Sequence, residues 1–174
     1  SVTLTNKGTL VNESGATLAD LGSYYDGQYY ARHLGSGGGS FINRGTYVHD
    51  GIGITNLYVF DNQGVIDVRQ GVVNVLKGNT VGGAVKLASG AALTFSAGDC
   101  ILKSAVTGSG LVELQGGTLS IDPAASVQGS LTQSGGTLTV TGNLADIQAL
   151  RLDAGLRTGS GDVSAKTFAF SGGT

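Results

Sequence analysis

The residues best suited to chemistry gather between positions 24 and 60. This stretch holds all six tyrosines, both histidines and two of the five phenylalanines. Exposed tyrosines offer flat faces to sugar rings, while carboxylates accept and arginines donate hydrogen bonds to hydroxyl groups. We therefore predict weak glycan or surface binding here. The residues assigned to it are Tyr24, Tyr25, Asp26, Tyr30, Arg32, His33, Arg44 and His49.

Other chemical motifs are scarce. Cys100 is the only cysteine, so no intrachain disulfide is possible, and we interpret it as a buried apolar residue. The sequence contains neither His-x-x-x-His nor Cys-x-x-Cys, and we predict no metal and no cofactor. The glycine run at 35–39 is not followed by the Lys-Ser/Thr of a phosphate loop. The segment at 159–162 is an isolated match to calcium-binding repeats.

Glycines recur along the chain about every nineteen residues, which is the mark of a stacked-repeat protein. The repeat anchors are Gly8, Gly27, Gly45, Gly64, Gly83, Gly110 and Gly129, continued by Gln148 and Thr167. The segments after these glycines are short, alternating and rich in β-branched residues, which indicates strands. A unit of this length cannot form a core of its own and must stack on its neighbours.

Equivalent positions in successive turns should then form rows of stacked side chains. The second residue after each anchor is always apolar or aromatic, which predicts an inward row: Leu10, Tyr29, Tyr47, Ile66, Val85, Val112, Leu131, Leu150 and Ala169. For Tyr29 and Tyr47 this core role is favoured over sugar binding. The next position should face outward. There Asp67, Lys86 and Glu113 alternate in charge and should lie side by side.

These rows predict an all-β, right-handed parallel β-helix of about nine turns in a single domain spanning residues 1–174. The step from Gly83 to Gly110 is 27 residues (110 − 83), longer than the others by eight. We therefore expect one enlarged turn between residues 83 and 110, with part of residues 96–109 bulging from the stack as a loop or an extra corner. Neither end of the predicted stack carries a charged or helical cap. The chain is thus expected to be an excerpt of a longer stalk, or a fibre subunit that stacks end to end.

Composition narrows the class of protein. Thirty-one glycines against one proline suit a solenoid with tight corners and unbroken hydrogen-bond ladders. A net charge of −2 argues against nucleic acid and anionic membranes as partners. No run of eighteen apolar residues exists that would span a bilayer as a helix.

The repeats resemble those of the secreted bacterial β-helices of the filamentous-haemagglutinin and autotransporter-passenger type. The pattern Asn-x-Gly before a strand occurs at Asn6, Asn43 and Asn62, and Gly-Gly-Thr-Leu occurs at 116 and 135. The resemblance implies an extracellular or cell-surface stalk that serves adhesion or surface assembly. Its partners would be further coils of the same polypeptide, other copies, glycans or a host surface. The Asn-Pro-Asn motif of that family's secretion domain is absent, which favours a piece of the stalk.

Two alternatives remain open from the sequence. The first is a carbohydrate-binding module that uses the aromatic-rich N-terminal turns. The second is a β-helical polysaccharide lyase, glycosidase or phage tailspike fragment, in which carboxylates would line one groove. The candidate carboxylates Asp26, Asp50, Asp61 and Asp67 fall at different positions of the repeat. We therefore do not expect an enzyme.

Overall fold

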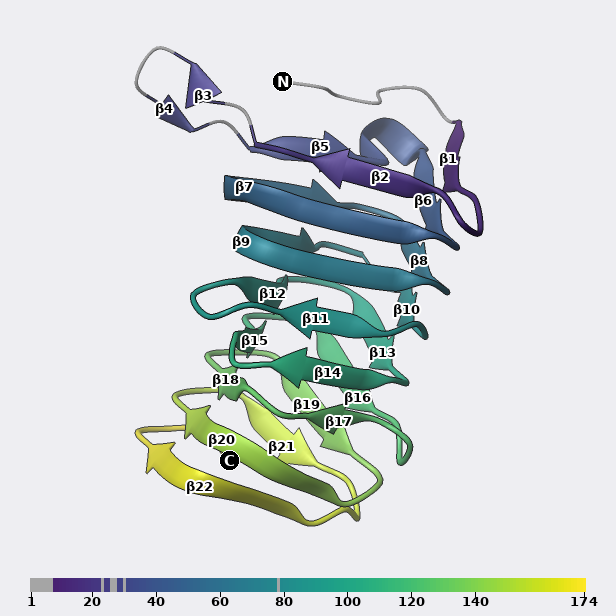
Figure 1. Cartoon of the computed structure of the whole chain (residues 1–174). Coiled ribbons are helices and arrows are strands. Elements are labelled where there is room, and N and C mark those ends of the chain that lie inside the picture. The colour runs from purple at the N-terminus through teal and green to yellow at the C-terminus, as the bar shows by residue number, and fades with distance from the viewer. Residues whose placement is uncertain (1–7, 23, 26–27, 30, 78) are drawn as a thin grey trace.

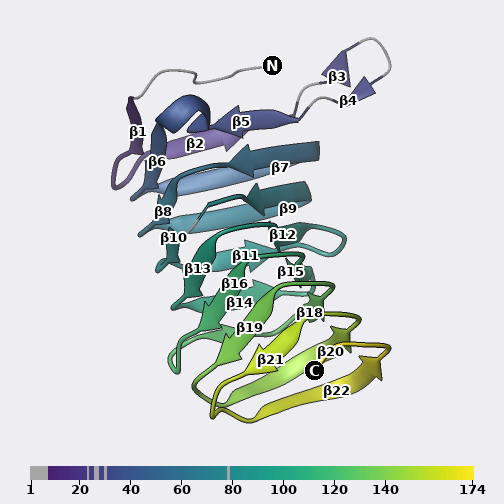
Figure 2. The same cartoon turned by 180° about the vertical axis from the view of Figure 1, so that it is seen from behind.

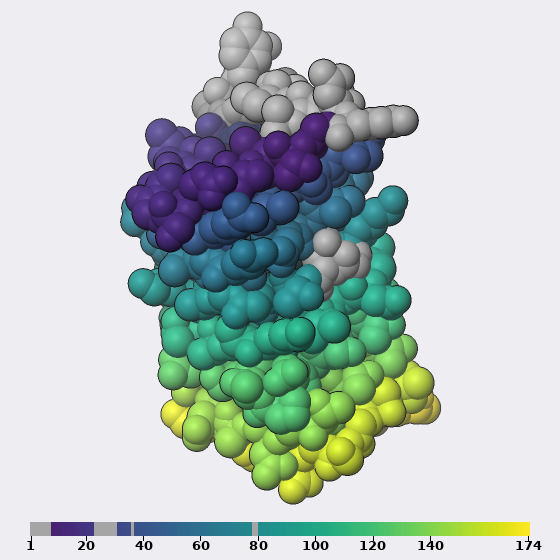
Figure 3. Space-filling model, turned by 90° about the vertical axis from the view of Figure 1, so that its right-hand side faces the viewer, coloured from purple at the N-terminus to yellow at the C-terminus, as the bar shows by residue number. Residues whose placement is uncertain are grey.

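The computed structural model describes residues 8–22, 24–25, 28–29, 31–77 and 79–174, and it shows a stack of parallel β-strand turns. Figures 1 and 2 show the chain winding right-handedly from the N-terminal to the C-terminal end, and Figure 3 shows the turns as successive bands. One short 3₁₀ helix, η1 (Ser36–Gly38), interrupts the β-structure of the described part. None of the described helices is long and apolar enough to cross a membrane.

Each turn contributes one strand to an eight-stranded sheet and then crosses a twelve-stranded sheet. The strands of the eight-stranded sheet are β1 (Thr9–Asn12), β6 (Ser40–Asn43), β8 (Phe60–Asn62), β10 (Asn79–Val81), β13 (Asp99–Leu102), β16 (Thr118–Ile121), β19 (Thr137–Val140) and β21 (Leu156–Thr158). Successive strands of this sheet pair in parallel. The stack therefore has about seven turns of about 19 residues, not the nine predicted.

The twelve-stranded sheet has two limbs, which each turn crosses in order. The first limb contains β2 (Thr17–Asp20), β11 (Val85–Leu87), β14 (Ala105–Gly108) and β17 (Ser126–Val127). The second limb contains β5 (Arg32–Leu34), β12 (Ala92–Phe95), β15 (Leu111–Leu114) and β18 (Ser130–Gln133). Both limbs are crossed by the long strands β7 (Thr46–Leu57), β9 (Val65–Val75), β20 (Leu144–Leu152) and β22 (Val163–Phe170).

Alternation along each strand places one set of side chains in the core. In β16, β18 and β19 the half-buried and buried residues alternate strictly. Tyr47, Ile66 and Val85 are adjacent in the first limb and fully buried, which confirms the predicted inward row there. Val112, Leu131 and Leu150 are likewise adjacent and buried, but in the second limb.

The predicted row joined these two limbs wrongly, and its first member, Leu10, lies in the eight-stranded sheet beside Phe41 while Leu18 is the neighbour of Tyr47. Val85 pairs with Val106 rather than with Val112, because glycines precede strands at more than one corner of a turn. The predicted anchors Gly45, Gly64 and Gly83 therefore precede strands of the first limb, whereas Gly110 and Gly129 precede strands of the second limb. For the same reason Lys86 lies beside Asp67, as predicted, but its other neighbour is Thr107 and not Glu113.

The predicted bulge at 96–109 is also wrong. Its residues form β13 and β14, which pair in register with the turns on both sides. The enlarged turn is the first one instead, since β1 and β6 begin 31 residues apart (40 − 9). The additional chain includes the antiparallel hairpin of β3 (Tyr24–Tyr25) and β4 (Gln28–Tyr29), which lies beyond the N-terminal end of the stack in Figure 1. Tyr29 therefore lies in this hairpin and not in the inward row.

The Asn-x-Gly motifs at Asn43 and Asn62 have a structural role at one corner of the stack, together with Asn12, whereas the motif at Asn6 begins outside the described residues. Asn12 donates a hydrogen bond to Asn43 at 2.8 Å, and Asn43 donates to Asn62 at 2.7 Å. All three side chains are buried, and Asn43 also donates to the carbonyl of Val65. These bonds satisfy amides that would be costly to bury unpaired. The glycine that follows is required because a Cβ at Gly64 would collide with the backbone of Arg44 and Gly45.

Candidate functional site

A cluster of polar side chains lies inside the first two turns, where a solenoid core is expected to be apolar. Its centre is Asp20, at the end of β2. The Asp20 carboxylate accepts hydrogen bonds from the Tyr47 hydroxyl at 2.9 Å and from the Thr55 hydroxyl at 2.5 Å. Nδ1 of His49 lies 3.1 Å from the same carboxylate oxygen, and Arg32 pairs with the other oxygen. We call these five residues the Asp20 cluster.

Strand register brings the Asp20 cluster together. Asp20 pairs with His49 across β2 and β7, and Arg32 pairs with Thr55 across β5 and β7. Alternation places Asp20 on the same face of its strand as Leu18, so its carboxylate points inward. In the following turns the row of Asp20 and His49 continues with Val68 and Leu87, both buried. The core therefore changes from polar to apolar within two turns.

Burial governs the protonation of the cluster. The His49 side chain is 0% exposed, and burial lowers its pKa below the usual value. Nε2 lies 3.3 Å from the Gly53 carbonyl, a longer contact than that of Nδ1 with Asp20. We therefore assign the proton of the neutral ring to Nδ1, which then donates to Asp20. Burial also raises the pKa of Tyr47, so the phenol stays protonated and donates to Asp20 as well.

The Asp20 cluster has the residue types of an acid–base site but not the access that one requires. A carboxylate, an imidazole and a phenol in contact could transfer protons to and from a substrate. Here the Asp20 and Arg32 side chains are 9% and 11% exposed, and Tyr47, His49 and Thr55 already contact one carboxylate oxygen of Asp20. The arrangement instead neutralises one buried charge with another and closes the N-terminal end of the core.

The structure divides the eight predicted binding residues. Arg32 and His49 belong to the buried cluster and offer no surface to a glycan. His33 faces outward and is half-buried, with its Nδ1 3.5 Å from Asn56 and its ring centre 5.8 Å from that of Tyr58. Arg44 is exposed and pairs with Glu13 at 3.2 Å.

The other four predicted residues are Tyr24, Tyr25, Asp26 and Tyr30. Asp26 and Tyr30 lie outside the described residues. Tyr24 and Tyr25 form β3, and their side chains are outside the description. Glycan binding by these residues stays a prediction.

Of the candidate carboxylates, Asp50 and Asp67 share one arginine as their partner, whereas Asp26 lies outside the described residues. Asp50 and Asp67 both contact the exposed side chain of Arg69, at 3.4 and 3.0 Å. Asp61 accepts a hydrogen bond from Gln63. No group of three His, Cys, Asp or Glu among the described residues is arranged to hold a metal ion.

Sequence analysis missed Asp20 and Thr55, although a signal was present. Asp20 follows Leu18 by two residues and His49 follows Tyr47 by two, so both occupy the same position of their repeat. An acid and a base at one inward position of successive turns predict a buried pair. This pattern can be recognised only when Leu18 is aligned with Tyr47. The β3–β4 hairpin lengthens the first turn and hides that alignment in the sequence.

Comparison with known proteins identifies no family for this chain. No family model, no curated protein and no solved structure matches the chain. The fold is a parallel β-solenoid.

Proposed function

We propose that the chain is a structural stalk segment of a secreted bacterial surface protein, one that holds other parts of an adhesive or surface assembly at a distance. The observation that carries this proposal is the continuity of the core. One inward row of the second limb runs through Val73, Leu93, Val112, Leu131 and Leu150 without a polar residue. Stacked turns of this kind resist bending because each strand inside the stack is hydrogen-bonded to both neighbours.

The outward faces support the same function. They carry stacked pairs of small polar groups, such as Ser96 with Asn74 at 2.6 Å and Ser171 with Asp153 at 2.6 Å. Eight strands span seven steps of about 4.8 Å each, which gives a rod of about 34 Å. The secreted location rests on the resemblance of the repeats to bacterial surface β-helices.

A stalk made of equivalent turns should tolerate the loss of one whole turn. Thr118 and Thr137 occupy the same position of β16 and β19, so deleting residues 118–136 joins Gly117 to Thr137 in register. We expect this variant to fold cooperatively and to be shorter by about 4.8 Å in solution scattering. Deleting residues 118–127 alone is the control. It removes β16 and β17 but keeps β18, so the later strands no longer meet their partners in the same sheet and the C-terminal turns should unfold.

The competing functions are tested directly. The purified chain should neither degrade a panel of polysaccharides nor bind a glycan array more tightly than about 1 mM. Degradation of any polysaccharide would contradict the structural proposal. Tight binding lost in Tyr24→Ala, Tyr25→Ala or Tyr30→Ala would instead establish a carbohydrate-binding module.

A further inference from the structure

The outward face of the second limb carries a row of mainly apolar side chains. Strand pairing stacks the six residues of this apolar row in successive turns: Ile54, Val72, Ala92, Leu111, Ser130 and Ala149. Ile54 is 45% exposed, and Val72 and Leu111 are half-buried. Contiguous apolar side chains on a surface mark contact sites for other molecules.

A groove follows the apolar row across four strands. Its volume is about 430 Å³, and Ala92, Leu111, Ser130 and Ala149 form part of its lining. Leu111 is the largest of these side chains, whereas the other three are small. The groove can therefore receive an apolar side chain from a partner.

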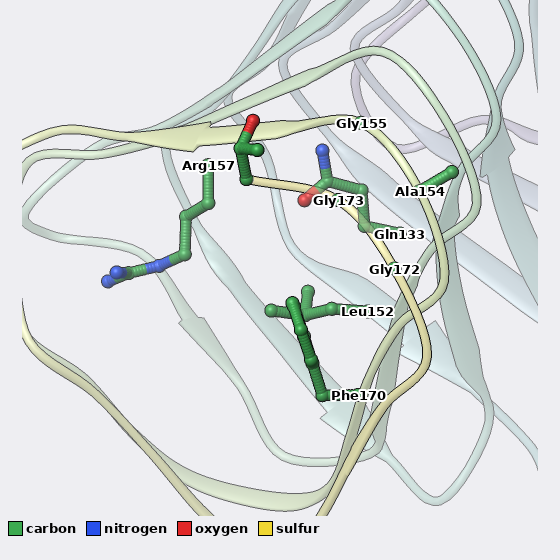
Figure 4. A pocket seen from close by; sticks show the side chains of 9 residues that line it. Gln133, Leu152, Ala154, Gly155, Arg157, Phe170, Gly172 and Gly173 are labelled. Atoms are coloured by element: carbon green, nitrogen blue, oxygen red, sulfur yellow. The ribbon is translucent and has the colours of Figure 1, made fainter.

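This groove differs from the hollow at the C-terminal end. That hollow, of about 200 Å³, lies between Gln133, Leu152 and Phe170, which are inward residues of the last turns. Figure 4 shows Leu152 and Phe170 side by side there. The hollow is thus part of the core, whereas the groove lies on the outer side of the stack.

Beside the apolar row lies a polar row that contains one charge of each sign. Glu113, Thr132 and Arg151 are adjacent on β15, β18 and β20. Glu113 accepts a hydrogen bond from Ser134 at 3.2 Å. The Arg151 side chain is 62% exposed, and its Nε donates to Asp153 at 2.6 Å. The two opposite charges therefore lie one strand to either side of Thr132.

We propose that two copies of this chain associate side by side through this face, with their stacks antiparallel and a two-fold axis along β18. Such an axis reverses the order of the strands but keeps each row opposite itself. Glu113 of each copy then faces Arg151 of the other, and Leu111 faces Ala149. One symmetry axis thus pairs opposite charges and also sets the largest side chain of the groove against a small one.

The other facing positions are compatible with this axis. The facing pairs are Ser130 with Ser130, Thr132 with Thr132, Ala92 with Thr167, and Thr94 with Ala169. None of these pairs brings two like charges together. The contact lies on the side of the stack, so a further turn at either end would lengthen it without changing its register. The association therefore agrees with the proposed stalk segment.

The size of the face sets the expected strength. Residues 110–115, which are β15 with one corner residue at each end, span about 20 Å. The five facing strands β12, β15, β18, β20 and β22 span about 24 Å, so each copy offers about 500 Å². The total of about 1,000 Å² lies below the range of stable interfaces. We therefore expect a weak dimer with a dissociation constant of about 100 μM.

Sedimentation equilibrium of the 174-residue chain from about 10 μM to about 2 mM brackets this affinity. We expect a monomer–dimer equilibrium. Glu113→Arg places an arginine opposite Arg151 and should weaken dimerisation at least about 10-fold. Glu113→Arg/Arg151→Glu restores opposite charges and should return the dissociation constant to within about 3-fold of the native value. Asp99→Arg makes the same charge change at an exposed residue of the eight-stranded sheet and, as the matched control, should have no effect.

Three results would overturn the proposal. A native chain that is monomeric at every concentration would show that a second copy does not cover this face. Oligomers beyond the dimer would exclude a closed two-fold contact. A double variant as weak as Glu113→Arg, or a Glu113→Arg variant as strong as the native chain, would exclude the antiparallel pairing of Glu113 with Arg151. Each result leaves the stalk proposal intact, because the turn-deletion experiment depends on the stack within one copy. Circular dichroism of every variant checks that the β-structure is retained.

Discussion

Nδ1 of His49 lies 3.1 Å from the Asp20 carboxylate, at a position of the repeat that Val68 and Leu87 occupy in the next two turns. A buried acid and base thus replace an apolar pair at the start of the stack. Asp20 also forms an ion pair with the buried Arg32. Removing one partner of a buried ion pair costs more than the pair contributes, because the other charge stays buried. The Asp20 cluster should therefore control the stability of the N-terminal turns.

The first prediction concerns Asp20 itself. Asp20→Ala leaves Arg32, Tyr47, His49 and Thr55 without their shared acceptor. It should lower the free energy of unfolding by about 3–5 kcal/mol in urea titrations. Glu13→Ala removes the acid of the exposed pair with Arg44 and serves as the control, with an expected loss of about 0–1 kcal/mol. Equal losses in the two variants would show that the Asp20 cluster is not an important source of stability.

The second prediction concerns pH. Burial lowers the pKa of His49 in the folded chain, so the unfolded chain binds a proton first as pH falls. The stability from neutral His49 is complete above the unfolded pKa of about 6.5. As pH falls below about 6.5, the free energy of unfolding decreases by at most about 1.4 kcal/mol per pH unit.

Unfolding titrations between about pH 7.5 and pH 5 measure this slope above the range where carboxylates titrate. His49→Val should flatten it. Leu87→Val removes a methylene from the same row without a titrating group and should keep it. An unchanged slope in His49→Val would refute the assignment to His49.

A third prediction follows from the glycine corners. A Cβ at Gly83 would collide with the backbone of Gln63 and Gly64 in the preceding turn. We expect Gly83→Ala to destabilise the fold by about 1–3 kcal/mol through this overpacking. Gly8 is the matched control, since a Cβ there has no atom within 4 Å. Thermal unfolding should show a lower midpoint for Gly83→Ala, and equal midpoints for both variants would contradict the packing explanation.

The fourth prediction uses Cys100 to test the register of β13. The side chain is 1% exposed because it lies in the inward row with Leu119 and Leu138. The native chain should therefore react with a thiol reagent only through opening of the fold, and the reaction should become fast in urea. Rapid reaction without denaturant would place Cys100 in a surface loop and contradict the pairing of β13.

Much of this fold could be predicted from local patterns. Alternation at Ile66 and Val112 identifies strands and inward positions, and the recurring glycines indicate stacked turns. The register between distant turns could not be predicted, because a glycine precedes a strand in either limb. Gly83 and Gly110 look equivalent in sequence although they lie at different corners. The predicted row also ended at Ala169, whereas Phe168 pairs with Leu150 because that step is 18 residues (168 − 150).

The candidate site was less predictable, for a physical reason. Sugar binding was predicted from residue types that occur on surfaces as well as in cores. Arg32 can be buried because Asp20 neutralises its charge, and His49 can be buried because Asp20 accepts its hydrogen bond. Only the pairing of β2 and β5 with β7 brings these residues together, and this pairing crosses an insertion without repeat character.

The central claim is a rigid parallel stack with one 4.8 Å step per turn. Arg44 and Thr141 are exposed and follow strands β6 and β19 at the same corner, five strands apart in the eight-stranded sheet. Spin labels at Arg44→Cys and Thr141→Cys, with buried Cys100 left unlabelled, measure this separation by pulsed electron paramagnetic resonance. The stack predicts one narrow distance distribution centred near about 24 Å. A broad distribution, or a centre differing by two or more steps, would contradict it.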